Sequence, residues 1–154
     1  MTWTLALMGA IAAAGATSAS AQTTCAGQAG PAMVKLSVAA TDLRNSSGEM
    51  AITLYGDSKS RFLAKGGKLA RQRVPAHAPT TSVCFWVKPG AYAVATYHDE
   101  NGDHDFNRTL FAIKEGFGFS NDAPTTLGLP SFSAARFLVP ASGAAIRIRT
   151  RYQR

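Results

Sequence analysis

The sequence has no charged side chain in its first two dozen residues. The apolar, alanine-rich run in this part, residues 5–16, is shorter than the roughly 20 residues that a membrane-spanning helix needs. It leads into Ala19 and Ala21, small residues at the spacing of an A-x-A cleavage site. We therefore expect residues 1–21 to be a signal peptide and the mature chain to have no transmembrane span. An uncleaved anchor is the alternative, since no Lys or Arg precedes the apolar run.

Cysteine is also scarce, with only Cys25 and Cys84 in the chain. In the oxidising compartment that an exported protein reaches, two such cysteines predict one disulfide, which would tie the new N-terminus to an internal strand. Two separate buried thiols are the alternative. We expect residues 22–31 to be an N-terminal leader and residues 32–154 a single domain. A domain of this length can bury a core without a metal or a partner.

Acidic residues are few, nine against sixteen lysines and arginines, which gives a formal net charge of +7. Most of the acidic residues fall between Asp99 and Asp122. A basic cluster precedes them, formed by Lys59, Arg61, Lys65, Lys68, Arg71 and Arg73. The default interpretation of this cluster is a solvated face, and contact with an anionic envelope surface or polysaccharide is the functional alternative. Phe62 is the only aromatic residue within this cluster. Together with the expected export, this argues against nucleic-acid binding.

No amphipathic helix and no internal repeat occur in the mature part of the chain. Instead, apolar and polar residues alternate with a period of two, which is typical of strands with one buried face. The alternating segments are residues 33–38, 49–55, 80–87, 91–98, 135–139 and 145–152. We expect the first two to be neighbours and residues 80–98 to form a hairpin around Lys88, Pro89 and Gly90. The register of residues 57–79 is not predicted.

About seven short strands with one long loop, from Asp99 to about Ser133, predict an all-β fold. Short strands with turns at regular spacing and without helices favour a two-sheet antiparallel sandwich over other all-β arrangements. The last segment has Arg147, Arg149 and Arg151 on one side, so we expect that side to face solvent.

Three separate motifs carry a resemblance to a known family. They are the segment GAYAVATYHDENGD at 90–103, EGFGFSN at 115–121 and PSF at 130–132. Together with the early strands around residues 46–48 and 54–55, they closely resemble the DUF2141 family of exported bacterial proteins. The resemblance implies a small secreted domain of uncharacterised function, an immunoglobulin-like or prealbumin-like sandwich. The hairpin that enters the loop is similar to that of prealbumin-like surface modules, which usually bind or connect and rarely catalyse. His104 stands where the family commonly has a glycine.

The long loop begins with oxygen-bearing side chains at every second position. Asp99, Asn101, Asp103 and Asp105 could present several hard oxygen ligands to one cation, so Ca²⁺ is a candidate cofactor. His104 replaces the usual glycine and Leu110 the bidentate glutamate, so Glu115 or Asp122 would have to complete the site. Asp and Asn also form turns by bonding their own backbone, which is the alternative without an ion. Zinc held by His98, His104 and an aspartate is a lesser option.

The function that these features favour is that of an exported binding or accessory module, periplasmic or secreted, with its functional end in the long loop. A candidate ligand rim combines His98, Glu115, Phe117, Phe119 and Asn121. A hydrolase that uses His98 and loop carboxylates is the second hypothesis, and a purely structural envelope protein is the third. Ser120 lies outside any G-x-S-x-G elbow, so no catalytic residue is assigned and enzyme activity is not expected.

Overall fold

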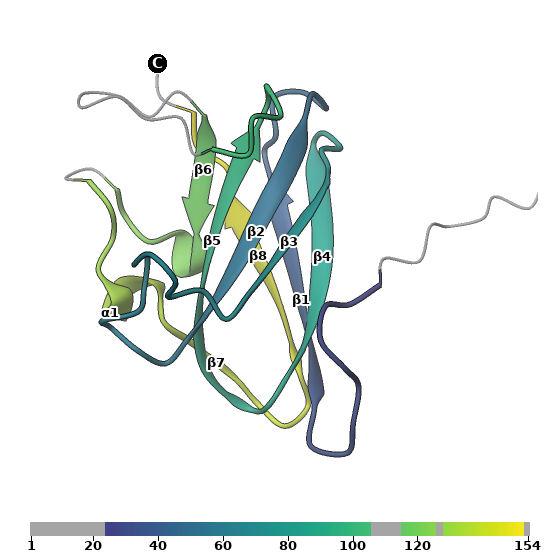
Figure 1. The fold of residues 1–154 in the computed structure, drawn as a ribbon, viewed down its shortest axis with the longest axis vertical. Coiled ribbons are helices and arrows are strands. Elements are labelled where there is room, and N and C mark those ends of the chain that lie inside the picture. The colour runs from purple at the N-terminus through teal and green to yellow at the C-terminus, as the bar shows by residue number, and fades with distance from the viewer. Residues whose placement is uncertain (1–23, 106–114, 126–127, 153–154) are drawn as a thin grey trace, which may run out of the picture.

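The computed structural model describes residues 24–105, 115–125 and 128–152. The predicted signal peptide, residues 1–21, lies outside them. The elements, drawn in Figure 1, are β1 (Val34–Thr41), β2 (Glu49–Gly56), β3 (Ala70–Pro75), β4 (Thr80–Val87), β5 (Gly90–Asp99), β6 (Gly116–Phe119), a 3-10 helix (Ser120–Asp122), α1 (Phe132–Ala135), β7 (Phe137–Val139) and β8 (Ala144–Arg149). None of the helices in this described part is long and apolar enough to cross a membrane.

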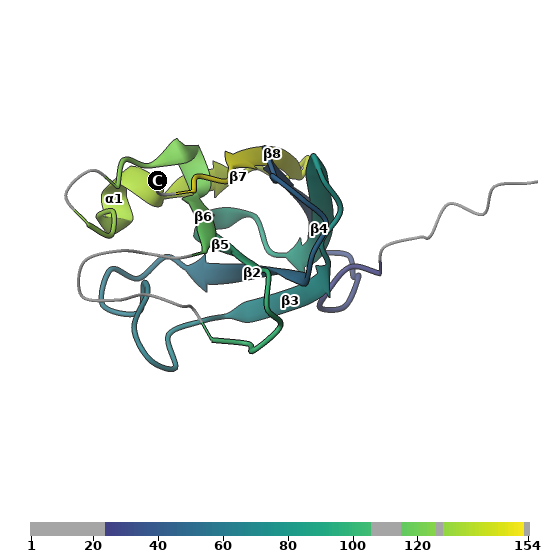
Figure 2. The ribbon, with the colours of Figure 1, turned by 90° about the horizontal axis from the view of Figure 1, so that it is seen from above.

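The strands form two sheets that pack face to face, so the predicted all-β sandwich is confirmed. One sheet has the order β4-β1-β8, and the other has the order β3-β2-β5-β6 with β7 also paired to β5. Figure 2 shows the two layers from above. All pairs are antiparallel except β1 and β8, which run parallel. A parallel pair cannot be joined by a tight turn, and here most of the chain lies between its two strands.

The predicted hairpin over residues 80–98 is wrong. β4 pairs with β1, whereas β5 pairs with β2, so the turn at Lys88 to Gly90 carries the chain from one sheet to the other. The two earliest strands, predicted to be neighbours, likewise lie in opposite sheets. Both errors have one cause: an alternating strand reveals which face it buries but not which strand lies beside it, and short turns also connect strands across a sandwich.

The predicted long loop also contains elements that were not expected. β6, the 3-10 helix and α1 all lie between Asp99 and Arg136. β6 has the sequence GFGF, and glycine has a low β propensity because it brings no side chain to pack. The strand pairs with β5 through Phe117 opposite Tyr97 and Phe119 opposite Ala95.

The main core lies between the sheets, with Leu36, Val38, Ile52, Val94 and Ile148 fully buried. A second apolar cluster lies on the outer face of the β3-β2-β5-β6 sheet. It consists of Ala51, Tyr55, Phe62, Ala93, Tyr97, Phe117, Phe119, Ala123 and Ala135. Both faces of β2 and β5 are therefore covered, although an antiparallel sheet of this kind often leaves one face to water. This second cluster is where the candidate site forms.

Cys25 and Cys84 form the predicted disulfide. Next to it, the backbone of Ala26 pairs with β4: Ala26 N–H donates to the Cys84 carbonyl at 2.9 Å, and Trp86 N–H donates to the Ala26 carbonyl at 2.8 Å. The disulfide thus ties the start of the described chain to the edge of the smaller sheet. It is compatible with an extracellular location, since disulfides persist in oxidising compartments.

Candidate ligand-binding site

β6 is positioned by two glycines that allow it to approach β8. A Cβ on Gly118 would lie 2.4 Å from the Arg149 carbonyl oxygen and 2.7 Å from Ile148 Cγ2. A Cβ on Gly116 would lie 2.3 Å from the ring of Tyr152. Glycine at these inward positions leaves no side chain between the sheets. The alternate residues, Phe117 and Phe119, therefore project from the opposite, outer face of the strand.

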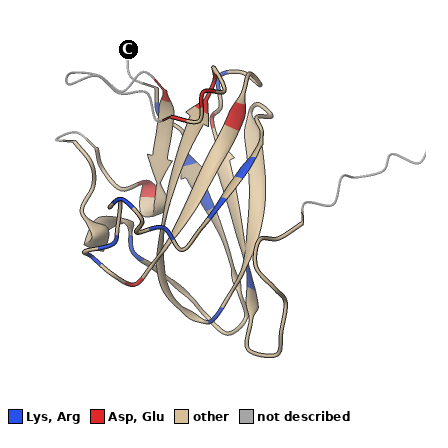
Figure 3. Ribbon diagram, viewed as in Figure 1, with Lys and Arg blue, Asp and Glu red and all other residues tan. Residues whose placement is uncertain are grey.

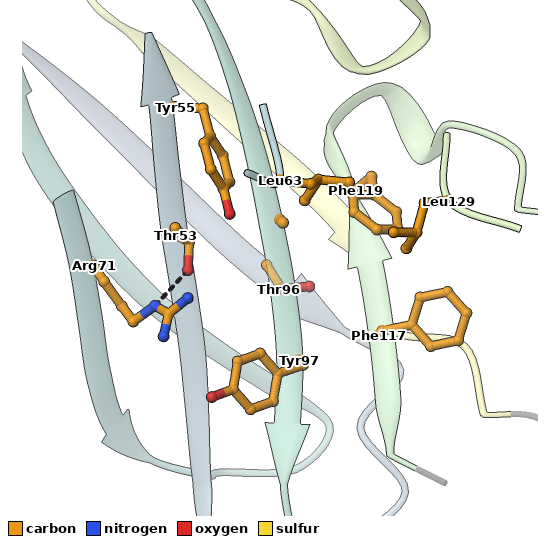
Figure 4. Close-up of a pocket in the computed structure, with 10 residues that line it drawn as sticks. Thr53, Tyr55, Leu63, Arg71, Thr96, Tyr97, Phe117, Phe119 and Leu129 are labelled. Atoms are coloured by element: carbon orange, nitrogen blue, oxygen red, sulfur yellow. Dashed lines mark hydrogen bonds between the residues drawn. The ribbon is translucent and has the colours of Figure 1, made fainter. Parts of the chain in front are cut away.

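These two rings line a cavity of about 250 Å³ on the outer face of the larger sheet. Figure 4 shows how β2, β3, β5 and β6 each contribute side chains to it, together with two loop leucines. The lining residues are Thr53, Tyr55, Leu63, Arg71, Ala95, Thr96, Tyr97, Phe117, Phe119 and Leu129. The four aromatic residues among them are each at least nine-tenths buried. The cavity walls are thus held in place by packing behind them.

One wall is the segment between β2 and β3, which Phe62 fastens to the sheet. The Phe62 ring lies 5.3 Å from that of Tyr55, 5.7 Å from that of Phe132 and 6.4 Å from that of Phe119, measured between centroids. These tilted and edge-on contacts are the favoured geometry for aromatic pairs. The neighbouring Leu63, which lines the cavity, has a φ of 57°, a left-handed conformation that costs about 1–2 kcal/mol. The aromatic packing holds it there.

A second anchor joins this wall to α1. The guanidinium of Arg136 donates two hydrogen bonds to the Asp57 carboxylate, at 2.9 and 3.0 Å. The hydrogen bond from Arg136 lowers the pKa of Asp57. Asn121 holds α1 from the other side, because its Nδ2 donates to the carbonyl oxygens of Ala134 at 3.1 Å and Arg136 at 2.8 Å. The segments around the cavity are therefore bonded to one another.

Arg71 supplies the one charged side chain among the described lining residues. Its Nε donates to Thr53 Oγ1 at 2.7 Å, and its guanidinium carbon lies 5.9 Å from the centroid of the Tyr97 ring. Burial raises the pKa of Tyr55 and of Tyr97, and the nearby arginines lower it by less. Both hydroxyl groups thus stay protonated at neutral pH, and the cavity presents a cation, neutral polar groups and aromatic rings.

The predicted oxygen ladder lies beyond the end of β5 and closes on its own backbone. Asp99 is fully buried and accepts hydrogen bonds from the backbone N–H of Gly102 at 2.8 Å and of His104 at 2.9 Å. Asn101 Oδ1 accepts from Asp103 N–H at 3.3 Å, and Asp103 Oδ1 accepts from Asp105 N–H at 2.9 Å. These contacts are those of Asx-type turns.

Arginines neutralise the base of this loop. Arg73 donates to Asp99 Oδ2 at 3.1 Å, and it also bonds the hydroxyl of Tyr97. Arg44 pairs with Glu100, and the hydrogen bond from Arg44 lowers the pKa of Glu100 despite its partial burial. Figure 3 shows most of the acidic residues at this end of the sandwich, away from the basic segment before β3.

Two groups of three residues in the described part of the chain bring potential metal-ligating atoms within 4.8 Å of one another. The first consists of Asp99, Asp103 and Glu115, and the second of Glu49, Asp99 and His104. The structure therefore brings Glu115 to two members of the predicted ladder.

His98 does not join either group. It is fully buried on the inner face of β5, with Nδ1 2.7 Å from the Tyr152 hydroxyl and Nε2 2.7 Å from the Ser47 carbonyl oxygen. Both ring nitrogens are thus used by the fold. His98 and His104 do not converge as the zinc hypothesis requires.

The predicted ligand rim is divided between three places. Phe117 and Phe119 line the cavity, Glu115 is buried beside the acidic loop, and His98 and Asn121 serve the packing described above. Tyr55, Tyr97 and Arg71 line the cavity but were not predicted from the sequence. Tyr97 could have been found from its strand pattern. It is a large aromatic residue that follows three alanines on one face of the strand, whereas Val94 and Thr96 lie on the opposite face.

The fold and this site define a small β-sandwich module with an aromatic cavity on the outer face of one sheet. The chain belongs to the family described as an uncharacterized protein conserved in bacteria, DUF2141, which residues 38–147 match. Comparison with curated proteins and comparison with solved structures each gave no match.

Proposed function

We propose that this protein is an exported binding module of the bacterial envelope, periplasmic or secreted, whose ligand occupies the aromatic cavity on the larger sheet. The observation that carries the proposal is the cavity itself. Its four aromatic residues are buried and fixed by ring contacts, yet they enclose about 250 Å³ beside an exposed arginine. Apolar concave sites with a few polar groups are the usual form of small-molecule sites. The predicted signal peptide and the disulfide support export.

Binding fits the contacts of the site better than hydrolysis does. The residues of the hydrolase hypothesis are engaged in holding the fold: His98 through both ring nitrogens, Asp99 through Arg73 and two backbone N–H groups. Ser120 Oγ donates to the Ala135 carbonyl oxygen at 2.5 Å. A general base needs a nitrogen or oxygen within reach of a substrate proton, and these groups already have other partners.

The basic segment supports an anionic partner at the envelope. Lys59, Arg61, Lys65 and Lys68 are exposed on the wall between β2 and β3, which provides Leu63 to the cavity and leads into Arg71 on β3. Clustered charge of one sign raises the local concentration of oppositely charged ligands. Calcium binding by the acidic loop stays a prediction, which the convergence of Asp99, Asp103 and Glu115 supports.

A neutral fluorescent probe, N-phenyl-1-naphthylamine, tests whether the cavity binds apolar ligands. We expect saturable fluorescence enhancement with the purified protein, and strong weakening in Ala95→Phe, because the added ring fills the cavity next to Phe119. Leu138→Ser is the matched control, since Leu138 is an exposed apolar residue, 68% accessible, on β7 outside the cavity. Probe binding that survives Ala95→Phe in a folded variant, or that disappears in Leu138→Ser, would contradict the proposal.

A further inference from the structure

Arg71 is an exposed cation that no Asp or Glu side chain pairs with in the described part of the chain. Its Nε–H is bonded to Thr53 Oγ1 at 2.7 Å, which fixes the plane of the guanidinium. A guanidinium carries five N–H donors in a rigid fork. Thr53 Oγ1 cannot accept all of them, so Arg71 offers the cavity donors whose geometry matches a carboxylate.

The remaining lining is uncharged, and four of its side chains are aromatic. Tyr97 lies under the guanidinium, while Phe117, Phe119 and Leu129 form the opposite side of the cavity in Figure 4. Aromatic rings favour offset or edge-on contacts with another ring. A cavity of about 250 Å³ is also slightly smaller than the roughly 300–1,000 Å³ of sites that hold drug-sized molecules. The lining and the volume together select a small planar ligand.

The charges around the cavity favour a negative ligand. The exposed basic residues of the segment before β3 lie on one wall, and Asp57 on the same wall is paired with Arg136. Asp99 and Glu100, the acidic residues that directly follow the cavity-lining part of β5, are paired with Arg73 and Arg44. Net repulsion of an anion by these carboxylates is therefore reduced, while attraction by the unpaired arginine remains.

We propose that the ligand of this site is a small aromatic carboxylate, with its carboxylate paired to the guanidinium of Arg71 and its ring among Tyr97, Phe117 and Phe119. The inference rests on the proposed function and adds the chemical class of the ligand. Steric fit comes from the aromatic walls, and selection of the anion comes from Arg71. Binding is reversible and involves no covalent step.

Isothermal titration with 2-naphthoate and 2-naphthamide tests this, because the two probes share the same ring and differ only in the group that Arg71 would bind, a carboxylate anion in one and a neutral amide in the other. We expect the unmodified protein to bind the carboxylate about tenfold more tightly than the amide, the size of effect that a charge-assisted hydrogen-bonded pair produces. Arg71→Gln should remove this preference, because it lowers the affinity for the carboxylate much more than the affinity for the amide. Arg71→Lys should restore part of it. Lys68→Gln, which removes an exposed charge outside the lining, is the control and should retain the preference.

The outcomes separate this inference from the proposed function. If both naphthalene probes displace N-phenyl-1-naphthylamine with equal affinity, or if Arg71→Gln keeps the preference for the carboxylate, the cavity binds ligands but the inference is overturned. If neither probe binds and the neutral dye does not bind either, both the inference and the proposed function fail. Equal thermal midpoints of Arg71→Gln and the unmodified protein confirm that the variant is folded, as expected for an exposed residue on an edge strand.

Discussion

Gly118 has no side chain, and this lets β6 lie against β8 with Phe117 and Phe119 on the cavity side. At the scale of single residues, the site depends as much on this lack of a side chain as on the aromatic rings. His98 illustrates the opposite case, a polar ring that is fully buried and bonded through both nitrogens. Buried polar groups of this kind are costly unless their hydrogen bonds are made.

The close contact at Gly118 predicts the effect of adding one methyl group. Gly118→Ala would place its Cβ 2.4 Å from a backbone oxygen that cannot move independently, so we expect the free energy of unfolding to fall by about 2 kcal/mol. Gly56→Ala is the control: no atom lies within 4 Å of its Cβ position, and its stability should change by less than about 0.5 kcal/mol. Urea denaturation measures both variants, and equal midpoints would show that β6 is not held by this contact.

At the scale of elements, the connection after β5 has two separate parts. Its first residues form successive Asx-type turns from Asp99 to Asp105, and β6 then returns beside β5. This return brings Glu115 to the turn. Hydrogen bonding to backbone N–H groups and binding of a cation are compatible, because each carboxylate oxygen has two lone pairs.

The convergence of three carboxylates predicts that this connection binds Ca²⁺ weakly. We expect a dissociation constant of about 0.1–1 mM, the range of extracellular modules. Asp103→Asn should weaken calcium binding strongly, because it removes one carboxylate charge from the group. Asp103 is chosen because it is the exposed member of the group. Asp42→Asn is the control, since Asp42 is an exposed acidic residue, at 62%, that directly follows β1 of the other sheet. If calorimetric titration shows no heat at millimolar calcium, the prediction of calcium binding is contradicted, and the oxygen ladder serves only as a turn.

At the scale of the whole molecule, two apolar layers and one disulfide hold the chain together. The main core joins the sheets, and the second cluster fastens α1 and the segment before β3 to the larger sheet. The cavity lies within the second cluster, so it is stabilised by segments that the disulfide does not touch. Cys25 and Cys84 instead close a chain segment with a sequence separation of 59.

Opening this bond should lower stability without abolishing the fold. The entropy of closing a loop of this length corresponds to about 4 kcal/mol, which reduction should subtract from the free energy of unfolding. Urea denaturation with and without reductant measures the change, and a Cys25→Ala, Cys84→Ala double variant, which should not respond to reductant, is the control. An unchanged midpoint after verified reduction would contradict the expected stabilisation.

Part of the candidate site was predictable from the sequence. Phe117 and Phe119 stood out because aromatic rings between glycines are unusual in a loop, and both line the cavity. Arg71 could not be assigned, because the register of its segment depends on pairing with β2 rather than on its own pattern. Tyr55 and Tyr97 face the same side only because β2 and β5 are neighbours.

The sequence by itself determined the all-β class, the approximate positions of most strands, the disulfide and the family. These follow from local alternation, from the presence of only two cysteines and from motifs that are continuous in the chain. The tertiary structure alone decided which strands are neighbours, that β4 and β5 belong to different sheets, and that four strands build one cavity. The physical reason is that alternation fixes the buried face of a strand, whereas its partner is chosen by competition among all apolar faces in the folded chain.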